Sequence, residues 1–199
     1  MRSITILGVR VDNVTMGEAV AAAHAFVRSD GAHMIVTPNP EICLAAQHDA
    51  EFRDILNRAD LAIPDGFGLL LAARFLGVPM RERVTGTDLL ERLAEESAKN
   101  GWKTYLLGGE PGIAERASRA LERRFPNMLI VGRDAGEEGI VERIRAANPD
   151  VVFVALGAVK QEKWIAEYLP QLHGVKVAMG VGGAFDFLSG EAMRAPLFL

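Results

Sequence analysis

Short runs of β-branched and aliphatic residues alternate along this chain with segments in which apolar residues recur every three to four positions. The runs expected to form strands are residues 34–37, 61–64, 104–107, 128–131, 151–156 and 177–179. The segments between them have the periodicity of amphipathic helices. Because strands that alternate with helices pair in parallel, the sequence predicts an α/β fold with a mainly parallel, Rossmann-like sheet flanked by helices.

The size and composition of the chain favour one domain, residues 1–199. Of its 199 residues, 49% are hydrophobic and 24% are charged. A domain of this length buries roughly 70% of the surface that its unfolded chain exposes. The formal net charge is −4, whereas nucleic-acid-binding proteins usually present a basic face to phosphates. We therefore expect no nucleic-acid partner.

Cysteine content and hydropathy indicate where the protein works. Cys43 is the single cysteine and cannot form an internal disulfide, which favours a reducing compartment. Residues 1–13 alternate between apolar and polar residues and lack the apolar run of a signal peptide. The most apolar stretch, 67–73, ends at Arg74, far short of the ~20 residues that a transmembrane helix needs. We expect a cytoplasmic protein with only peripheral membrane contact.

Three helix starts can be predicted from capping patterns. Thr15 with Glu18, and Asp88 with Glu91, have the spacing of a capping box. Pro111 suits the first turn of a helix that runs through residue 124.

Glycine and polar residues cluster directly after the predicted strands. In a parallel sheet the carboxyl ends of the strands share one edge, and ligands bind in the crevice there. We therefore expect five distant segments to form one site. They are Thr37-Pro38-Asn39, Pro64-Asp65-Gly66, Gly108-Gly109-Glu110, Gly157 with Lys160-Gln161-Glu162, and Gly180 to Gly183 with Asp186.

The glycine pair at 108–109 joins a predicted strand to a predicted helix. Glycines there let backbone N–H groups approach a phosphate beside the positive end of the helix. The alternative is a tight turn that needs positive φ angles, and the sequence leaves both open. Neither GxGxxG nor a Walker motif is present, which disfavours a classical dinucleotide or P-loop site.

Asp65 is the candidate general base. It lies between Pro64 and Gly66 at a strand end, where a carboxylate can face a ligand cleft and reach a substrate hydroxyl. On this motif alone, an N-cap for a helix beginning near Gly66 is equally compatible with the sequence.

Cations and amides near the same edge are candidate ligand contacts. Arg81 and Arg83 precede residues 85–88, and an arginine fork suits an anionic leaving group. A solvated surface pair is the alternative. Gln161 can donate and accept hydrogen bonds to a sugar or base, whereas Glu162 could contact ligand or simply complement a helix N-terminus.

Metal-binding patterns are weak in this chain. The four histidines are dispersed, and the nearest approach to an Asp-x-Asp pair is Asp49-x-Glu51 in a helical stretch. Residues two apart diverge on a helix, which favours a solvated face. We expect neither a metal nor a cofactor.

The motifs form an ordered set that resembles the bacterial WecG/TagA/CpsF glycosyltransferases, glycosyltransferase family 26. The similarity runs from Gly8-Val9 to Arg194-Ala195-Pro196. The motifs that carry it are Thr37-Pro38-Asn39, Pro64-Asp65-Gly66, Arg83-Val84-Thr85-Gly86-Thr87-Asp88, Leu107-Gly108-Gly109, Lys160-Gln161-Glu162 and Gly182-Gly183-Ala184-Phe185-Asp186.

The resemblance implies an inverting, metal-independent transfer of N-acetylmannosamine from UDP to undecaprenyl-diphosphate-linked N-acetylglucosamine, as in the linkage units of wall teichoic acid. It implies that Asp65 is the base and that the Gly108-Gly109 loop holds the donor diphosphate. The residues expected to bind substrate are Thr37, Asn39, Arg83, Gly86, Asp88, Gly108, Gly109, Lys160, Gln161, Glu162, Gly183 and Asp186.

This sequence departs from the family pattern in two respects. Val159 stands where the family usually has proline, and residues 134–139 differ from the family's usual Gly-Tyr-containing loop. The chain also stops at Leu199, whereas family members continue with a basic, amphipathic segment. On this basis we expect a core that folds but is incomplete for catalysis, with peripheral membrane contact in the longer form. Apolar surface left without that segment could favour a homo-oligomer.

Two other functions fit parts of the pattern. A non-catalytic nucleotide-sugar binding module would need the donor loops without the acceptor segment. An NAD-dependent oxidoreductase on a related fold is disfavoured by the missing fingerprint.

Overall fold

A six-stranded parallel sheet forms the centre of the computed structural model, which describes residues 2–136 and 138–190. The strand order is β4-β3-β8-β7-β5-β6. All six predicted strand runs and the predicted fold class are confirmed. The strands are β3 (His33–Val36), β4 (Leu61–Ala62), β5 (Lys103–Gly108), β6 (Leu129–Asp134), β7 (Val151–Ala155) and β8 (Val177–Gly180).

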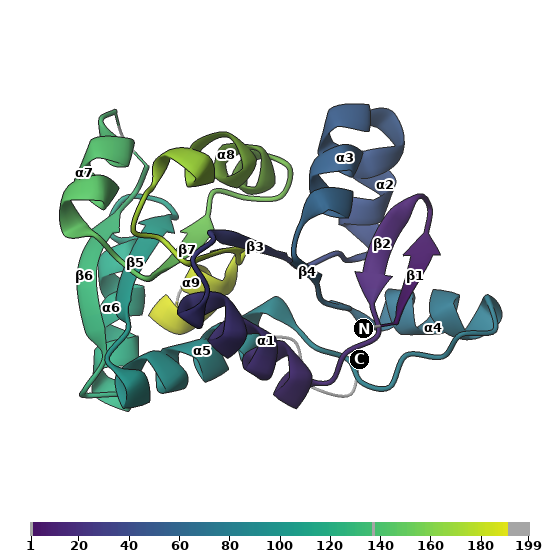
Figure 1. Cartoon of the computed structure of the whole chain (residues 1–199), viewed down its shortest axis with the longest axis horizontal. Coiled ribbons are helices and arrows are strands. Elements are labelled where there is room, and N and C mark those ends of the chain that lie inside the picture. Colours follow the sequence, from purple (N-terminus) through teal and green to yellow (C-terminus); the bar gives the residue numbers. More distant parts are fainter. Residues whose placement is uncertain (1, 137, 191–199) are drawn as a thin grey trace.

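Helices cover both faces of the sheet (Figure 1). One face carries α1 (Met16–Arg28), α5 (Gly86–Asn100), α6 (Ile113–Arg124) and α9 (Ala184–Ser189). The other carries α2 (Pro40–His48), α3 (Ala50–Arg58), α7 (Ile140–Ala147) and α8 (Lys160–Tyr168), which continues into η1 (Leu169–Gln171). Because neighbouring residues of a strand point to opposite faces, Phe153 packs in the first layer whereas Val152 and Val154 pack in the second.

An antiparallel hairpin, β1 (Ser3–Ile6) and β2 (Val9–Asp12), lies beside the edge strand β4. The Oδ2 atom of buried Asp12 accepts a hydrogen bond of 2.9 Å from the Ala62 N–H, and Arg10 Nη2 lies 3.4 Å from the same oxygen. The hairpin therefore takes up a backbone donor that an open sheet edge would leave unpaired. Hydrogen bonding to the edge of the sheet is therefore the structural role of the alternating apolar and polar residues near the N-terminus.

The capping box of α1 is confirmed, since the Thr15 side chain accepts from the Glu18 N–H and the Glu18 side chain accepts from the Thr15 N–H. The predicted box at Asp88 and Glu91 is wrong. Thr85 is the N-cap of α5: its hydroxyl accepts from the Asp88 N–H and donates to Asp88 Oδ2 at 2.7 Å. The N-cap of α5 thus lies three residues earlier than predicted. The pattern Thr85-x-x-Asp88 in the sequence could have located this N-cap.

Pro111 lies in the turn before α6 rather than in its first turn, so that prediction was wrong. The helix begins at Ile113 after Gly112, whose φ of 87° is left-handed. This backbone conformation favours glycine. The helix therefore begins at residue 113, two residues after the start expected with Pro111 as the first helical residue.

The direction of winding reverses within the sheet. From β3 the chain moves outward to β4, whereas from β5 it moves outward to β6 at the opposite edge, and β7 and β8 fill the centre. All neighbouring pairs in this sheet are parallel. The predicted site segments therefore emerge at one edge, where a winding reversal commonly opens a ligand crevice.

Candidate active site

Asp65, Thr37 and Gly86 meet at the carboxyl ends of β3 and β4. Asp65 Oδ2 accepts a hydrogen bond of 2.9 Å from the Gly86 N–H in the first turn of α5. A Cβ atom added at Gly86 would lie 3.0 Å from Thr37 Cγ2 and 3.3 Å from Asp65 Oδ2. Thr37 is buried and Asp65 is half-buried. Glycine at 86 is thus what lets the threonine and the carboxylate approach the helix end.

Backbone hydrogen bonds hold these three segments together. The Asp65 N–H donates to the Pro38 carbonyl at 3.0 Å, and the Val84 N–H donates to the Pro64 carbonyl at 3.2 Å. Asn39 caps α2, with its Oδ1 accepting from the Ile42 N–H at 2.8 Å. The position of the carboxylate is therefore set by main-chain contacts.

Asp65 does not cap α4, the helix that directly follows it. The N-cap of α4 (Phe67–Phe75) is Gly66, with a φ of 97° and no side-chain capping bond. The alternative interpretation of Asp65 as an N-cap is wrong. The carboxylate instead turns back toward the start of α5.

The two arginines before α5 have different surroundings. Arg81 pairs with Glu18 and donates from Nη2 to the Asn13 carbonyl at 2.6 Å, so it holds this segment against the start of α1. It is therefore engaged in a structural contact. Arg83 makes no hydrogen bond or ion pair with other residues that the structure describes.

Arg83 and Asp88 line a polar cleft of about 530 Å³ between α1, α5 and the end of α6. Charged side chains of both signs share this cleft, including Glu91, Arg92 and Arg124. Asp88 is also tied to Thr85 as described above. The structure thus places these two predicted residues in a cleft whose lining does not include Asp65.

The glycine pair at 108–109 is required by packing. Gly108 has a φ of 112°, and a Cβ atom there would lie 2.4 Å from the Ala155 carbonyl oxygen. The Gly109 N–H donates to that carbonyl at 2.9 Å. The tight-turn interpretation is therefore confirmed, and the Gly109 N–H is already used within the protein. Contact with a phosphate stays a prediction.

The Lys160-Gln161-Glu162 motif divides between surface and interior. Lys160 is exposed, whereas Gln161 and Glu162 are 1% and 0% exposed. Gln161 Oε1 accepts from the Gly182 N–H at 3.0 Å, and its Nε2 donates to Glu162 Oε1 at 2.7 Å. The Gln161 amide thus links α8 to the loop after β8, a role that the sequence did not predict.

Glu162 is a buried carboxyl in the first turn of α8. Its Oε2 atom has no hydrogen-bond partner among the described residues. Burial raises the pKa of this carboxyl from its ordinary value of 4.5, against the lowering effect of the hydrogen bond from Gln161. The position in the first helical turn agrees with the helix-complementing alternative, although the raised pKa favours the neutral form.

Backbone conformation is unusual just before α8. Val159 has a φ of 69°, which is rare for a β-branched residue. Proline, with φ near −65°, could not adopt this conformation. The valine that stands in place of the family's usual proline therefore has a backbone conformation that proline could not adopt.

Gly183 and Asp186 lie at the start of α9. Gly183 is the N-cap, and its carbonyl accepts from the Asp186 N–H at 3.1 Å. Because β8 lies between β3 and β7, this loop is flanked by the loops after those two strands. Neighbouring strands are spaced by about 4.8 Å. The predicted segments are thus brought to one edge, while Arg194-Ala195-Pro196 lies outside the described residues.

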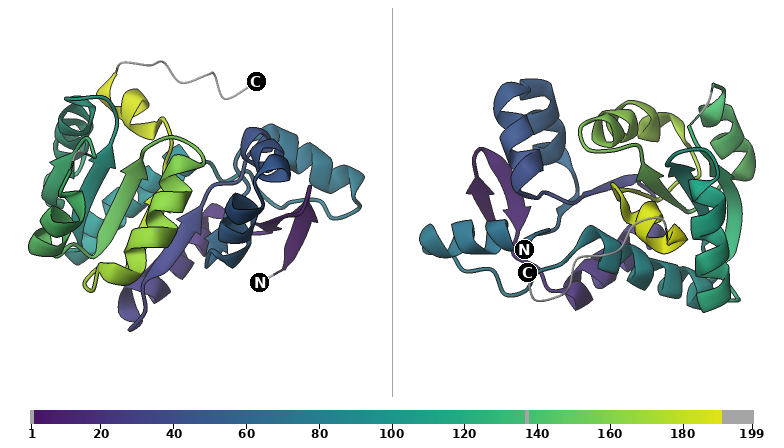
Figure 2. Two further views of the ribbon diagram at one scale, coloured as in Figure 1. Left: turned by 90° about the horizontal axis from the view of Figure 1, so that it is seen from above. Right: turned by 180° about the vertical axis from the view of Figure 1, so that it is seen from behind.

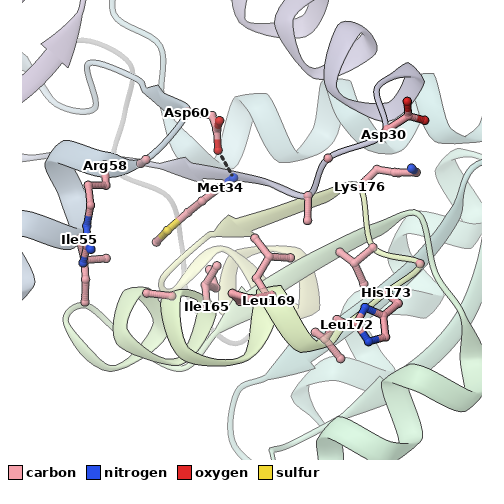
Figure 3. Close-up of a pocket in the computed structure, with 17 residues that line it drawn as sticks. Asp30, Met34, Ile55, Arg58, Asp60, Ile165, Leu169, Leu172, His173 and Lys176 are labelled. Atoms are coloured by element: carbon pink, nitrogen blue, oxygen red, sulfur yellow. Dashed lines mark hydrogen bonds between the residues drawn. The ribbon is translucent and has the colours of Figure 1, made fainter.

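A cavity of about 680 Å³ lies at the opposite, amino edge of the sheet (Figure 3). Its lining combines apolar side chains such as Met34, Ile165 and Leu169 with charged groups such as Lys176. Asp60 Oδ2 accepts from the Met34 N–H there at 2.8 Å. None of the predicted site residues line this cavity, so its size does not make it the candidate site.

Asp49 and Glu51 do not form a carboxylate pair open to a metal. Both lie beside the Lys163 ammonium, with O–N distances of 2.8 and 2.9 Å. The hydrogen bond from Lys163 lowers the pKa of Asp49, which also caps α3. Among the described residues, no group of three or more His, Cys, Asp or Glu side chains is arranged to hold a metal ion.

Comparison with known proteins places the chain in a class of enzymes. Residues 4–199 match the Glycosyl transferase WecG/TagA/CpsF family. The chain is 34% identical to the N-acetylglucosaminyldiphosphoundecaprenol N-acetyl-beta-D-mannosaminyltransferase of Staphylococcus aureus strain MRSA252, over 97% of this chain and 78% of that protein. Identity and coverage are the same for the proteins of that name from strains NCTC 8325 / PS 47 and COL.

Proposed function

The chain belongs to the WecG/TagA/CpsF family of glycosyl transferases, and on this premise we propose that it moves N-acetylmannosamine from a UDP donor to an undecaprenyl-diphosphate-linked N-acetylglucosamine. The names of the S. aureus relatives supply the transferred sugar and the lipid-linked acceptor. The UDP part of the donor comes from the family resemblance. We further propose that residues 1–199 act as one glycosyltransferase core.

Asp65 carries the mechanistic part of the proposal. Its half-buried carboxylate is oriented by the Gly86 N–H beside Thr37, at a strand end where a ligand can approach. As general base it takes the proton from the attacking hydroxyl of the acceptor. That oxygen forms a bond to the anomeric carbon of the donor while the bond to the UDP oxygen breaks. The configuration at the anomeric carbon inverts, and UDP leaves with the electron pair.

The donor diphosphate needs positive groups to stabilise its growing charge. Lys160 is exposed at the start of α8, and Arg83 makes no ion pair with other described residues. The N-termini of α6 and α9, which follow Gly108-Gly109 and Gly183, add partial positive charge. We assign these groups to the donor, with Asp186 as a hydrogen-bond acceptor for its sugar or uridine.

We propose that the reaction takes place at the inner face of the cell membrane, where a lipid-linked acceptor would be presented. Within residues 2–136 and 138–190, no helix has the length and apolar character needed to cross a bilayer. Because the relatives' acceptor is named as a diphosphoundecaprenol lipid, we propose that the protein reaches its acceptor at the membrane surface.

A donor and acceptor panel tests this function. The purified chain is incubated with UDP-N-acetylmannosamine and a short-chain lipid diphosphate that carries N-acetylglucosamine, and the disaccharide product is measured by mass spectrometry. UDP-glucose, UDP-N-acetylglucosamine and an acceptor without its sugar are the controls. Transfer only with the first pair supports the proposal. UDP-sugar binding in calorimetry without any transfer, in the longer form as well as in this chain, would instead identify a binding module.

A further inference from the structure

The helix directly after Asp65 and the turn that follows it expose a group of large apolar side chains. They are Phe67, Leu71, Phe75, Leu76 and Val78, with exposed fractions of 64%, 46%, 83%, 58% and 40%, and we call them the α4 surface. The opposite side of α4 buries Leu69 and Ala73 in the core layer that includes the hairpin. A helix that is apolar on both sides but packs against the protein on only one indicates that the exposed apolar side contacts a second partner.

The charge of this segment is also one-sided. Residues 66–80 contain no acidic side chain, although the whole chain has a net charge of −4. Arg74 is exposed amid the apolar residues, and its side chain makes no hydrogen bond or ion pair with other described residues. Apolar side chains mixed with an arginine are typical of helices that lie in the headgroup region of anionic membranes.

We propose that the α4 surface docks on an anionic phospholipid bilayer and so brings Asp65 to the lipid-linked acceptor, an inference that rests on the proposed function. Gly66, the N-cap of α4, directly follows Asp65. The nine residues of α4 span about 13 Å. A bilayer that takes up Phe75 and Leu76 therefore lies within reach of the site.

A second copy of the chain fits this surface less well. A stable protein interface uses roughly 20–30 residues on each side, whereas the α4 surface has five large apolar side chains. α4 also lies at one end of the molecule, far from β6 and α7 at the other end (Figures 1 and 2). A bilayer needs no matching surface, and each inserted side chain adds to binding independently.

Vesicle sedimentation tests the docking surface. We expect the chain to bind vesicles of equal parts phosphatidylcholine and phosphatidylglycerol. The triple variant Leu71→Gln, Phe75→Gln, Leu76→Gln should bind at least about ten-fold more weakly, because three apolar side chains no longer insert. Arg74→Glu should weaken binding by about five-fold on these vesicles and much less on phosphatidylcholine alone.

The matched control is Leu129→Gln with Val131→Gln, which removes exposed apolar side chains from β6, at the far end of the molecule. It should bind vesicles like the unaltered chain. Equal binding by the α4 triple variant, or no vesicle binding by the unaltered chain, would overturn the proposal. So would a dimer of the unaltered chain, seen by sedimentation velocity without lipid, that the triple variant converts to monomer.

Transfer assays separate this inference from the proposed function. With a short-chain, water-soluble acceptor, the triple variant should turn over at the rate of the unaltered chain, whereas with acceptor embedded in vesicles its rate should fall. Loss of turnover on both acceptors would show that these side chains act in the site rather than in docking. If the unaltered chain binds vesicles through α4 but transfers no sugar, the proposed function fails and the docking surface stands.

Discussion

Asp65 and Glu162 are two carboxyl groups at the same edge of the sheet, and their surroundings differ sharply. Asp65 is half-buried and is oriented by the backbone N–H of Gly86. Glu162 is fully buried, bonded through Oε1 to Gln161, with no partner at Oε2 among the described residues. The first is partly open to solvent, whereas the second is covered by the protein. Proximity to a strand end therefore does not by itself identify a reacting group.

This difference indicates that the two halves of the site, around Asp65 and around Glu162, have different roles. Around Asp65, three segments are joined by backbone hydrogen bonds, and the carboxylate is half-buried. Around Glu162, the side chain of Gln161 ties α8 to Gly182 and so shapes the loop after β8. We infer that the β3–β4 half performs the proton transfer and that Gln161 and Glu162 position the loops of the β7–β8 half.

The largest effect should come from exchanging each carboxyl for an amide. Asp65→Asn keeps an oxygen that can accept from the Gly86 N–H but removes the base, so transfer should fall by about 10²–10⁴-fold. Glu162→Gln should retain transfer within about ten-fold, because a buried positioning residue does not exchange a proton with substrate. The measurement is kcat/KM with the soluble acceptor. Similar losses in both variants would contradict this division of roles.

Folding has to be checked alongside these rates. Circular dichroism and urea unfolding should show Asp65→Asn within about 1 kcal/mol of the unaltered chain, since a partly exposed substitution that keeps its hydrogen bond has a small cost. An unfolded Asp65→Asn protein would remove the rate loss as support for a catalytic base.

Gly86→Ala should have the next largest effect. The added Cβ would lie 3.0 Å from Thr37 Cγ2 and 3.3 Å from Asp65 Oδ2, so the carboxylate or the threonine must shift. A small misplacement of a reacting group reduces transfer by about 10–100-fold. Gly17→Ala in α1, whose Cβ would come no closer than 4.0 Å to the Thr15 hydroxyl, is the matched control. Normal kcat/KM in Gly86→Ala would show that the approach of Thr37 to Asp65 is not needed.

The parallel sheet and its ligand-binding edge could be predicted because they depend on local patterns. Runs such as 151–156 have few alternatives to a buried strand, and parallel strands share their carboxyl edge. The start of α5 was placed wrongly because two residues, Thr85 and Asp88, both suit an N-cap, and only the hydrogen bond between them decides.

Burial within the site could not be predicted from the motif. Lys160, Gln161 and Glu162 are adjacent and polar, yet only Lys160 is exposed. A Cβ atom at Gly180 would lie 2.9 Å from Gln161 Nε2 and 3.0 Å from Glu162 Oε1. The depth of the two side chains thus depends on a glycine eighteen or more positions away, which no local pattern contains.

The smallest effect concerns pH and tests whether Glu162 is buried in solution. Burial raises its pKa in the folded protein, so the folded state binds the proton more tightly than the unfolded state does. This contribution to stability is complete below the ordinary pKa of 4.5 and is lost as the pH rises through the folded pKa. In that window the free energy of unfolding should fall by up to about 1.4 kcal/mol per pH unit relative to Glu162→Gln.

Urea unfolding of both proteins from pH 5 upward measures the difference. The control is Glu41→Gln, at an exposed residue of α2, which gives the effect of losing one surface carboxylate. A difference that stays flat with pH would place Glu162 in contact with solvent and make it, like Asp65, a carboxylate that is only partly covered by the protein.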